Sequence, residues 1–144
     1  MDWEHFITAL AEELAKLPAG ALVVISEPGE GKQSRYVQFA QSSGELVGYV
    51  VYNGFLDERV RATPRGEEAI MDAGWNPPRG PHDNWWQSLG WPATSKQYRD
   101  LARAIVIALR DGYGIDDISH WRYQAWNERS GEPIELRGLG LRPR

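Results

Sequence analysis

The segment from Pro28 to Ser34 carries residue types that could bind phosphate, with two glycines, a lysine and a hydroxyl side chain close together. A Walker-type loop needs four residues between its first glycine and the Gly-Lys pair. Ser or Thr must follow the lysine directly, so that amides, ammonium and hydroxyl converge on phosphate and magnesium. Here Gln33 separates Lys32 from the serine, and the residues that follow favour a strand instead of a helix. The segment therefore indicates a turn between two strands.

The other titratable residues predict neither a metal site nor a pair of catalytic acids. His5, His82 and His120 are far apart, without an i, i+4 pair or an HExxH motif. The adjacent acids 67–68 and 116–117 could each meet a distant carboxylate, as glycosidases need two acids about 5–10 Å apart. Such pairs are more typical of solvated turns and helices. The chain has no Gly-x-Ser-x-Gly elbow and no cysteine, so we expect no catalytic residue, no metal, no cofactor and no enzyme.

Aromatic side chains are the most concentrated chemistry of the chain. Four of its seven tryptophans lie between Gly74 and Pro92, namely Trp75, Trp85, Trp86 and Trp91. Prolines and glycines at this density prevent a continuous helix or ladder strand, so we expect a loop that displays the indoles. Flat aromatic faces could then line a surface for a peptide or a sugar, because they offer a large contact area at low entropic cost.

The same tryptophans could instead close the core. Trp75 and Trp91 are each flanked by glycine and followed closely by proline, and we expect them to pack against the ends of the sheet. Consecutive side chains diverge, so one ring of Trp85 and Trp86 should point inward and the other toward solvent. The exposed indole of this pair is the stronger binding candidate.

Three helices and several strands are predicted to position these residues. The helices and their N-caps are Trp3–Leu17 with Asp2, Pro64–Ala73 with Thr63, and residues 95–111 with Thr94 or Ser95. In the third helix Ile105–Leu109 is apolar nearly all the way round. This pattern indicates cover on more than one side, either by the chain's own sheet and loop or by a partner chain.

The strands are predicted as a three-stranded antiparallel meander and a final hairpin. Their ranges are Ala21–Ile25, Ser34–Ala40, Leu46–Asn53, Trp121–Asn127 and Pro133–Arg137, and the hairpin turns at Ser130-Gly131. In the meander, Tyr36 and Tyr49 should project from the sheet face opposite Val37. Together with the helices, these elements describe a small α+β domain.

Length and composition predict one soluble domain over residues 1–144. No segment approaches the roughly 20 apolar residues that cross a bilayer, and the first residues do not form an export signal, so we expect a cytoplasmic protein without a membrane partner. The net charge of −4 opposes binding to nucleic acid. We expect the basic residues Arg137, Arg142 and Arg144 to form an ordinary frayed tail.

Several segments together resemble one family. They are Leu17–Gly20, the strand Arg35–Ala40, Gly74-Trp75 with Pro77-Pro78, Asn84-Trp85, the helix from Leu101 to Gly114, and Tyr123–Trp126. In this order they resemble actinobacterial proteins of the TY-Chap family, which are grouped with type III secretion chaperones and YbjN-like proteins. The resemblance runs from Trp3 to Trp126. Its most specific pieces are the Arg-Tyr-Val-Gln-Phe strand and the Gly-Trp-x-x-Pro turn.

The resemblance implies an α+β fold, a twisted antiparallel sheet of about five strands with helices packed mainly on one face, as in type III secretion chaperones. It also implies a non-enzymatic, peptide-binding chaperone or adaptor that forms a homodimer and holds an extended client segment on apolar patches. This role agrees with the all-round apolar helix. It also suits recognition in which a peptide adds to a sheet edge or lies in an aromatic-lined groove.

Our leading hypothesis is therefore a chaperone-like module that binds a client protein or peptide. The contact residues we expect are Trp85, Trp86, Tyr36 and Tyr49. The alternative is a small-ligand or carbohydrate-binding domain that uses the tryptophan-rich segment, and an unrecognised hydrolase is the third possibility. A chaperone should show a shallow apolar surface, whereas an enzyme should show a deep pocket with converging acids or histidines.

Overall fold

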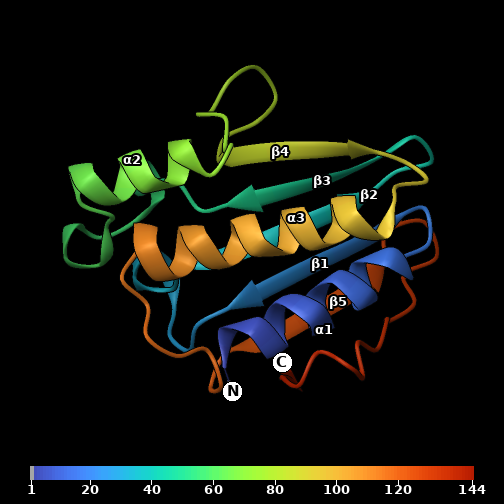
Figure 1. Ribbon diagram of the computed structural model, residues 1–144. Coiled ribbons are helices and arrows are strands. Elements are labelled where there is room, and N and C mark those ends of the chain that lie inside the picture. The colour runs from blue at the N-terminus through green and yellow to red at the C-terminus, as the bar shows by residue number, and fades with distance from the viewer. Residues whose placement is uncertain (1) are drawn as a thin grey trace.

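The computed structural model describes residues 2–144 as two layers, a sheet with helices packed on one of its faces (Figure 1). The helices are α1 (Trp3–Ala15), α2 (Pro64–Asp72) and α3 (Ser95–Ile107), and a π-helical turn (Ala108–Gly112) continues α3. Among these residues, no helix is long and apolar enough to cross a membrane. The arrangement confirms the predicted α+β fold with helices on one face of the sheet.

The sheet has six strands in the order β4-β3-β2-β1-β5-β6. Their bounds are β1 Ala21–Ser26, β2 Tyr36–Gln41, β3 Glu45–Val50, β4 Trp85–Gly90, β5 Arg122–Asn127 and β6 Arg142–Pro143. Neighbouring strands are antiparallel except β5 and β6, which are parallel. The predicted meander is present as β1, β2 and β3. The sheet has six strands instead of the expected five, because β4 and β6 form where we predicted no strand, whereas the strand that we expected at Pro133–Arg137 is absent.

The helices begin at the predicted caps. Asp2 accepts a hydrogen bond from the His5 amide at 2.7 Å, and Thr63 accepts one from the Gly66 amide at 3.0 Å. At the start of α3, Thr94 and Gln97 form a reciprocal capping box. These side chains satisfy backbone N–H groups that have no partner within the helix, which is why the helix starts could be predicted from the sequence.

The all-round apolar part of α3 is covered by this chain itself. Ile105, Val106, Ala108 and Leu109 are almost completely buried. α1 packs along α3, α2 packs on the π-helical turn, and the sheet lies beneath them (Figure 1). The contact with α2 is very close, because a Cβ atom on Gly66 would lie 2.1 Å from the Gly112 carbonyl oxygen. Of the two kinds of cover that we considered, the structure shows the one within the chain.

We predicted that the tryptophan-rich segment is one continuous loop, but the structure shows that it contains a strand, β4. Its prolines cluster between Pro77 and Pro81 and recur only at Pro92, which leaves Trp85–Gly90 free to pair with β3. Trp75 is buried, as expected, and its indole N–H donates to the Ala104 carbonyl at 3.0 Å. Trp91 stays partly exposed and does not pack against the core, so the expectation that it fastens the segment was wrong.

The C-terminal segment also departs from the prediction. The turn after β5 forms, but Pro133 makes only a single bridge to Trp126, and no strand covers 133–137. Instead, the segment leaves the sheet and buries three leucines under α1 before it returns as β6. These leucines are Leu136, Leu139 and Leu141. Burial of the leucines holds the end of the chain on the sheet, so the frayed tail that we expected is in fact fixed.

Candidate functional site

The face of the sheet opposite the helices carries partly exposed apolar and aromatic side chains. Side chains alternate along each strand, so one set faces the helices and the other faces away from them. We call this second surface the open face. Its central residues are Leu22, Val24, Gln38, Ala40, Val47, Tyr49, Trp86, Ser88, Gln124 and Trp126. None of them belongs to the packed core between sheet and helices.

A continuous apolar row crosses the open face. The strand register places Val47 beside Ala40, Ala40 beside Leu22, and Leu22 beside Trp126, on four adjacent strands. Cross-strand neighbours of this kind lie about 5 Å apart and form one surface. Leu22, Ala40 and Trp126 are each partly exposed, whereas Val47 is buried, so the row offers apolar contact area from Ala40 to Trp126.

Three aromatic rings form a cluster at the β4 end of the open face. Trp86 lies beside Tyr49 on the neighbouring strand, and the His82 ring stacks on Trp86 with centroids 4.3 Å apart. The Tyr49 hydroxyl and His82 Nδ1 are hydrogen-bonded at 2.9 Å. The Trp86 indole N–H donates to the Pro77 carbonyl at 3.2 Å, which fixes the ring in place. Hydrogen bonds and stacking thus hold the three residues together, and each of them remains partly exposed.

Burial explains the perturbed tyrosines. Partial burial is the main reason why the pKa of Tyr49 lies above its ordinary value, and the nearby carboxylate of Glu45 raises this pKa further. Stronger burial raises the pKa of Tyr113, whose hydroxyl donates to the Val51 carbonyl in the core. Both phenols therefore remain protonated at neutral pH and serve as hydrogen-bonding groups rather than bases.

The four side chains that we predicted as contacts divide between the two faces. Tyr36, Tyr49 and Trp86 lie on the open face, and the two tyrosines project opposite Val37 as predicted. Trp85 points the other way, is 3% exposed and packs near the Tyr52 ring at 5.6 Å. The inward and outward directions of the adjacent tryptophans are thus confirmed, although they lie on a strand and not on a loop.

Tyr36 is separated from the aromatic cluster. It lies two residues before Gln38, the strand partner of Tyr49, and packs partly against the edge of the core. Its hydroxyl accepts a hydrogen bond from the Asn84 side-chain amide at 3.4 Å, and Asn84 accepts one from the Tyr52 amide at 3.0 Å. Tyr36 thus connects the open face to the segment that leads into β4.

β4 presents a free backbone edge beside this cluster. Trp86 turns its backbone groups outward and exchanges hydrogen bonds with Asn76 at 3.0 Å in both directions. Backbone direction alternates along a strand, so Ser88 and Gly90 also turn their N–H and C=O groups outward. Within residues 2–144, no backbone group bonds to them. An edge of this kind is a template for pairing with another extended chain.

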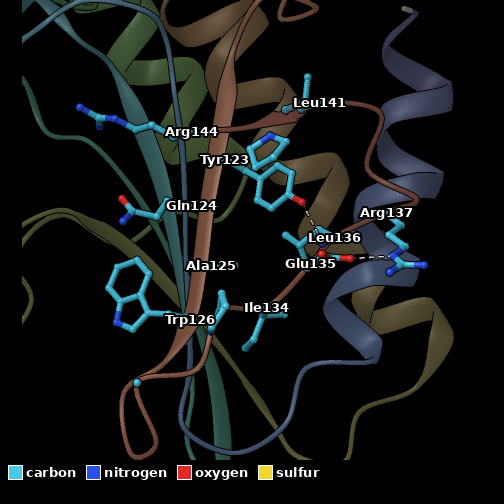
Figure 2. Close-up of a pocket in the computed structure, with 13 residues that line it drawn as sticks. Tyr123, Gln124, Ala125, Trp126, Ile134, Glu135, Leu136, Arg137, Leu141 and Arg144 are labelled. Atoms are coloured by element: carbon cyan, nitrogen blue, oxygen red, sulfur yellow. Dashed lines mark hydrogen bonds and ion pairs between the residues drawn. The ribbon is translucent and has the colours of Figure 1, made fainter.

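One cavity lies at the opposite end of the sheet, between β5 and the C-terminal segment. It has a volume of about 840 Å³ and a mixed lining that includes Gln124, Trp126, Ile134 and Leu136 (Figure 2). Its charged pair, Arg137 with Glu135 at 2.8 Å, lies on the rim (Figure 2). No group of three or more possible metal ligands occurs in residues 2–144. This cavity therefore offers no converging acid, base or metal site.

Sequence reasoning missed several residues of the open face, above all Leu22, Ala40, His82 and Trp126. The signal for Leu22 and Ala40 was present, because each alternates with buried residues of its own strand. Trp126 stood in the family motif but received no role. His82 could not be found, since only the hairpin in which Arg79 and His82 pair brings its ring onto Trp86.

Comparison with known proteins also indicates a protein that binds peptides. The family model TY-Chap3, described as T3SS (YopN, CesT) and YbjN peptide-binding chaperone 3, matches residues 1–127. No curated protein and no solved structure matches the chain. The matched region includes both the open face up to β5 and the free edge of β4. The match covers most of the 144 residues, and the chain belongs to the TY-Chap3 family of peptide-binding chaperones.

Proposed function

We propose that this protein is a non-enzymatic chaperone or adaptor that works in the cytoplasm and holds an extended segment of a client protein. The client segment pairs with the free edge of β4 and continues over the open face. The observation that carries this proposal is the position of Trp86, whose partly exposed ring adjoins the unpaired backbone groups of Ser88 and Gly90 on the same strand.

The backbone of the client supplies the first part of the interaction. A strand added beside β4 would bond to the outward groups of Ser88 and Gly90. Each such hydrogen bond contributes about 0.5–1.5 kcal/mol, because it replaces bonds to water. Backbone pairing is independent of sequence, which suits a protein that recognises an unfolded segment.

The side chains of the client supply the second part. Alternate residues of an added strand point toward the same face as Trp86, so their apolar groups can contact Trp86 and Tyr49. Beyond these rings the apolar row of Val47, Ala40 and Leu22 continues the surface. We therefore expect preference for extended segments with apolar or aromatic residues at every second position.

Trp85 supports this site without touching the client. It is buried on the helix side of the sheet and holds β4 against the core. Among the four predicted contacts, we therefore keep Trp86, Tyr49 and Tyr36 as surface residues and assign Trp85 an anchoring role.

A peptide array tests the proposal directly. Twelve-residue peptides of varied apolar content are immobilised, and the retained sequences are made in soluble, fluorescent form for anisotropy titrations. The same sequences with alternate amides N-methylated serve as controls, because N-methylation removes the donors that a sheet edge needs. We expect N-methylation to weaken binding at least tenfold. Equal affinity of both forms would contradict strand addition.

A pair of proline variants tests the edge on the protein side. Ser88→Pro removes an N–H that points away from the sheet, whereas Gln87→Pro removes one that faces β3. Ser88→Pro should keep the circular dichroism spectrum and lose peptide binding, while Gln87→Pro should disturb the fold. A Ser88→Pro protein that binds the peptides normally would show that the client does not use this edge.

The alternative, a small-ligand or carbohydrate-binding domain, would have to rely on Trp86 and Trp91, since Trp75 and Trp85 are buried. Titration with soluble oligosaccharides, followed by tryptophan fluorescence, tests it independently of peptide binding. Saturable quenching that Trp86→Ala abolishes would favour the alternative.

The homodimer also remains a prediction. Two copies that pair through their β4 edges would satisfy Ser88 and Gly90 in both chains and would compete with a client for the same backbone groups. Sedimentation velocity of the protein with and without a bound peptide separates these states. We expect any dimer to dissociate when the peptide binds.

A further inference from the structure

Three arginines come together at the corner of the open face formed by β5 and β6. The parallel pairing of these strands places Arg142 directly beside Arg122, and paired residues of neighbouring strands point to the same face. Arg122 lies on the open face, because it alternates along β5 with Gln124 and Trp126, and its β1 partner Ser26 alternates with Val24. Arg144 points to the same side as Gln124 and Trp126, away from Tyr123 (Figure 2). We call Arg122, Arg142 and Arg144 the arginine corner.

The charges of the arginine corner are not compensated within the described part of the chain. Arg122, Arg142 and Arg144 form no ion pair there, although several other arginines do. Two acidic side chains, Glu27 and Glu30, line a hollow together with Arg122 and Arg144. Glu27 is already bound by Arg35 at 2.7 Å, and Glu30 forms no ion pair with any of residues 2–144. Although the chain has a net charge of −4, three arginines against the single unpaired Glu30 give the side chains of this corner an excess of positive formal charge.

The backbone that carries these arginines is fixed. The Arg144 amide donates to the Tyr123 carbonyl at 2.7 Å, and the buried Leu139 and Leu141 hold the segment that precedes it. The guanidinium groups therefore extend from an ordered strand, and less conformational entropy is lost when an anion binds than on a frayed tail.

The strand register connects the arginine corner to the site on β4. A single row of the open face runs from Trp86 through Tyr49, Gln38, Val24 and Gln124 to the position beside Arg144. Five strand spacings of about 4.8 Å make this row about 24 Å long, which an extended chain spans with about seven residues. A client that pairs with β4 and crosses the face would reach the arginines at that distance.

We propose that the client segment carries acidic side chains about seven residues beyond the part that pairs with β4, and that the arginine corner binds them. The inference rests on the proposed function and adds to it the charge pattern of the client. Arginine favours carboxylates because its planar donors can form two parallel, charge-assisted hydrogen bonds. The local positive potential also speeds the encounter with an acidic segment.

Paired peptide probes test this inference. A peptide retained by the array is extended by a Gly/Ser spacer of three, seven or eleven residues that ends in Asp-Asp, and matched probes end in Asn-Asn. The Asp-Asp probe with the seven-residue spacer should bind about five- to tenfold more tightly than the matched Asn-Asn probe at low salt. The three-residue spacer should give less gain, and 0.3 M salt should remove most of the gain.

Two variants with the same change in charge locate the effect. R122Q/R144Q should lose the gain for Asp-Asp and bind the Asn-Asn probe normally. R65Q/R99Q changes exposed arginines on α2 and α3, on the helical side of the sheet, and should keep the gain. Circular dichroism confirms that both variants are folded.

The possible outcomes separate the two proposals. If the Asn-Asn probes bind and the Asp-Asp probes bind with the same affinity, the arginine corner does not recognise acidic residues. This result would contradict the present inference and leave the proposed function intact. Equal loss in both variants would assign the gain to net charge and overturn the inference as well. If a single-stranded oligonucleotide of equal charge competes as well as the acidic peptide, the corner binds polyanions instead. If no peptide binds the wild-type protein, both proposals fail.

Discussion

The two edges of the sheet are treated in opposite ways. At β4, the outward backbone groups of Ser88 and Gly90 have no backbone partner among the residues that the structure describes. At β5, the chain's own C-terminal segment lies along the edge, with hydrogen bonds from Asn127 to Glu132, from Ile134 to Ala125 and from Arg144 to Tyr123. Free edges promote aggregation, and proteins normally cover or disrupt them. Since residues 128–144 cover one edge and the other edge is left open, we expect β4 to be the edge that binds a client.

The cover also lies outside the region that matches the family. The family match ends at residue 127, which is the last residue of β5. Thus the open edge lies within the matched region, and the segment that closes the other edge lies beyond it. The matched region therefore contains the β4 edge and the strands of the open face up to β5, whereas the cover over β5 and the arginines of β6 lie outside it.

The largest expected effect separates the two neighbouring tryptophans of β4. Trp85→Ala should lower the free energy of unfolding by about 3–5 kcal/mol, because it opens a cavity in the core. Trp86→Ala should cost less than about 1 kcal/mol and should weaken peptide binding at least tenfold. Urea denaturation and anisotropy titration measure the two effects. Equal destabilisation by both substitutions would mean that the open face is structural.

The next effect tests the cover over β5. Leu139 is completely buried between this segment and the rest of the core, so Leu139→Ala should cost about 2–5 kcal/mol. Urea denaturation gives the value, and peptide binding at β4 should stay unchanged in the folded variant. A loss below about 1 kcal/mol would show that the cover contributes little to stability.

A smaller effect is expected where the cover is fastened to α1. The buried Glu13 carboxylate accepts a hydrogen bond from the Gly138 amide at 2.9 Å. Glu13→Ala leaves that amide without its partner and should cost about 1–3 kcal/mol. The adjacent exposed residue supplies the control, since Glu12→Ala should change stability by less than about 0.5 kcal/mol. Faster amide exchange at Gly138 in the Glu13 variant alone would localise the effect.

The smallest effect on stability is expected at the open edge itself. Ser88→Pro should change the free energy of unfolding by less than about 1 kcal/mol, because the Ser88 N–H has no partner in the described fold. The same variant should nevertheless lose peptide binding. A large loss of stability would reveal that this N–H is used within the protein and that the two edges are less different than the structure indicates.

Local rules predicted the parts of the fold that depend on neighbouring residues. The caps at Asp2, Thr63 and Thr94 mark the helix starts, and the apolar runs of the meander are long enough to identify three strands. The opposite directions of Trp85 and Trp86 follow from the geometry of an extended chain. The family resemblance, carried by few motifs, covered nearly the same residues as the family match.

The remaining parts depend on long-range contacts that no local rule contains. β4 is hidden because prolines and glycines surround a six-residue strand, and pairing with β3 outweighs their influence. β6 has only two residues. The leucines that hold the C-terminal segment follow neither a helical nor a strand period, so their burial under α1 could not be inferred. The open face needed the complete register, since each row draws one residue from each strand.

The position of Arg144 has a practical consequence for work with residues 1–144. The backbone of Arg144 is bound to β5, and its side chain lies on the same side as Trp126 (Figure 2). A purification tag or fluorescent protein joined to Arg144 would emerge beside the open face and could block it. Capture experiments with such a fusion would then recover no client even if one exists. A tag joined before Asp2, at the start of α1 in the helical layer, avoids this false negative.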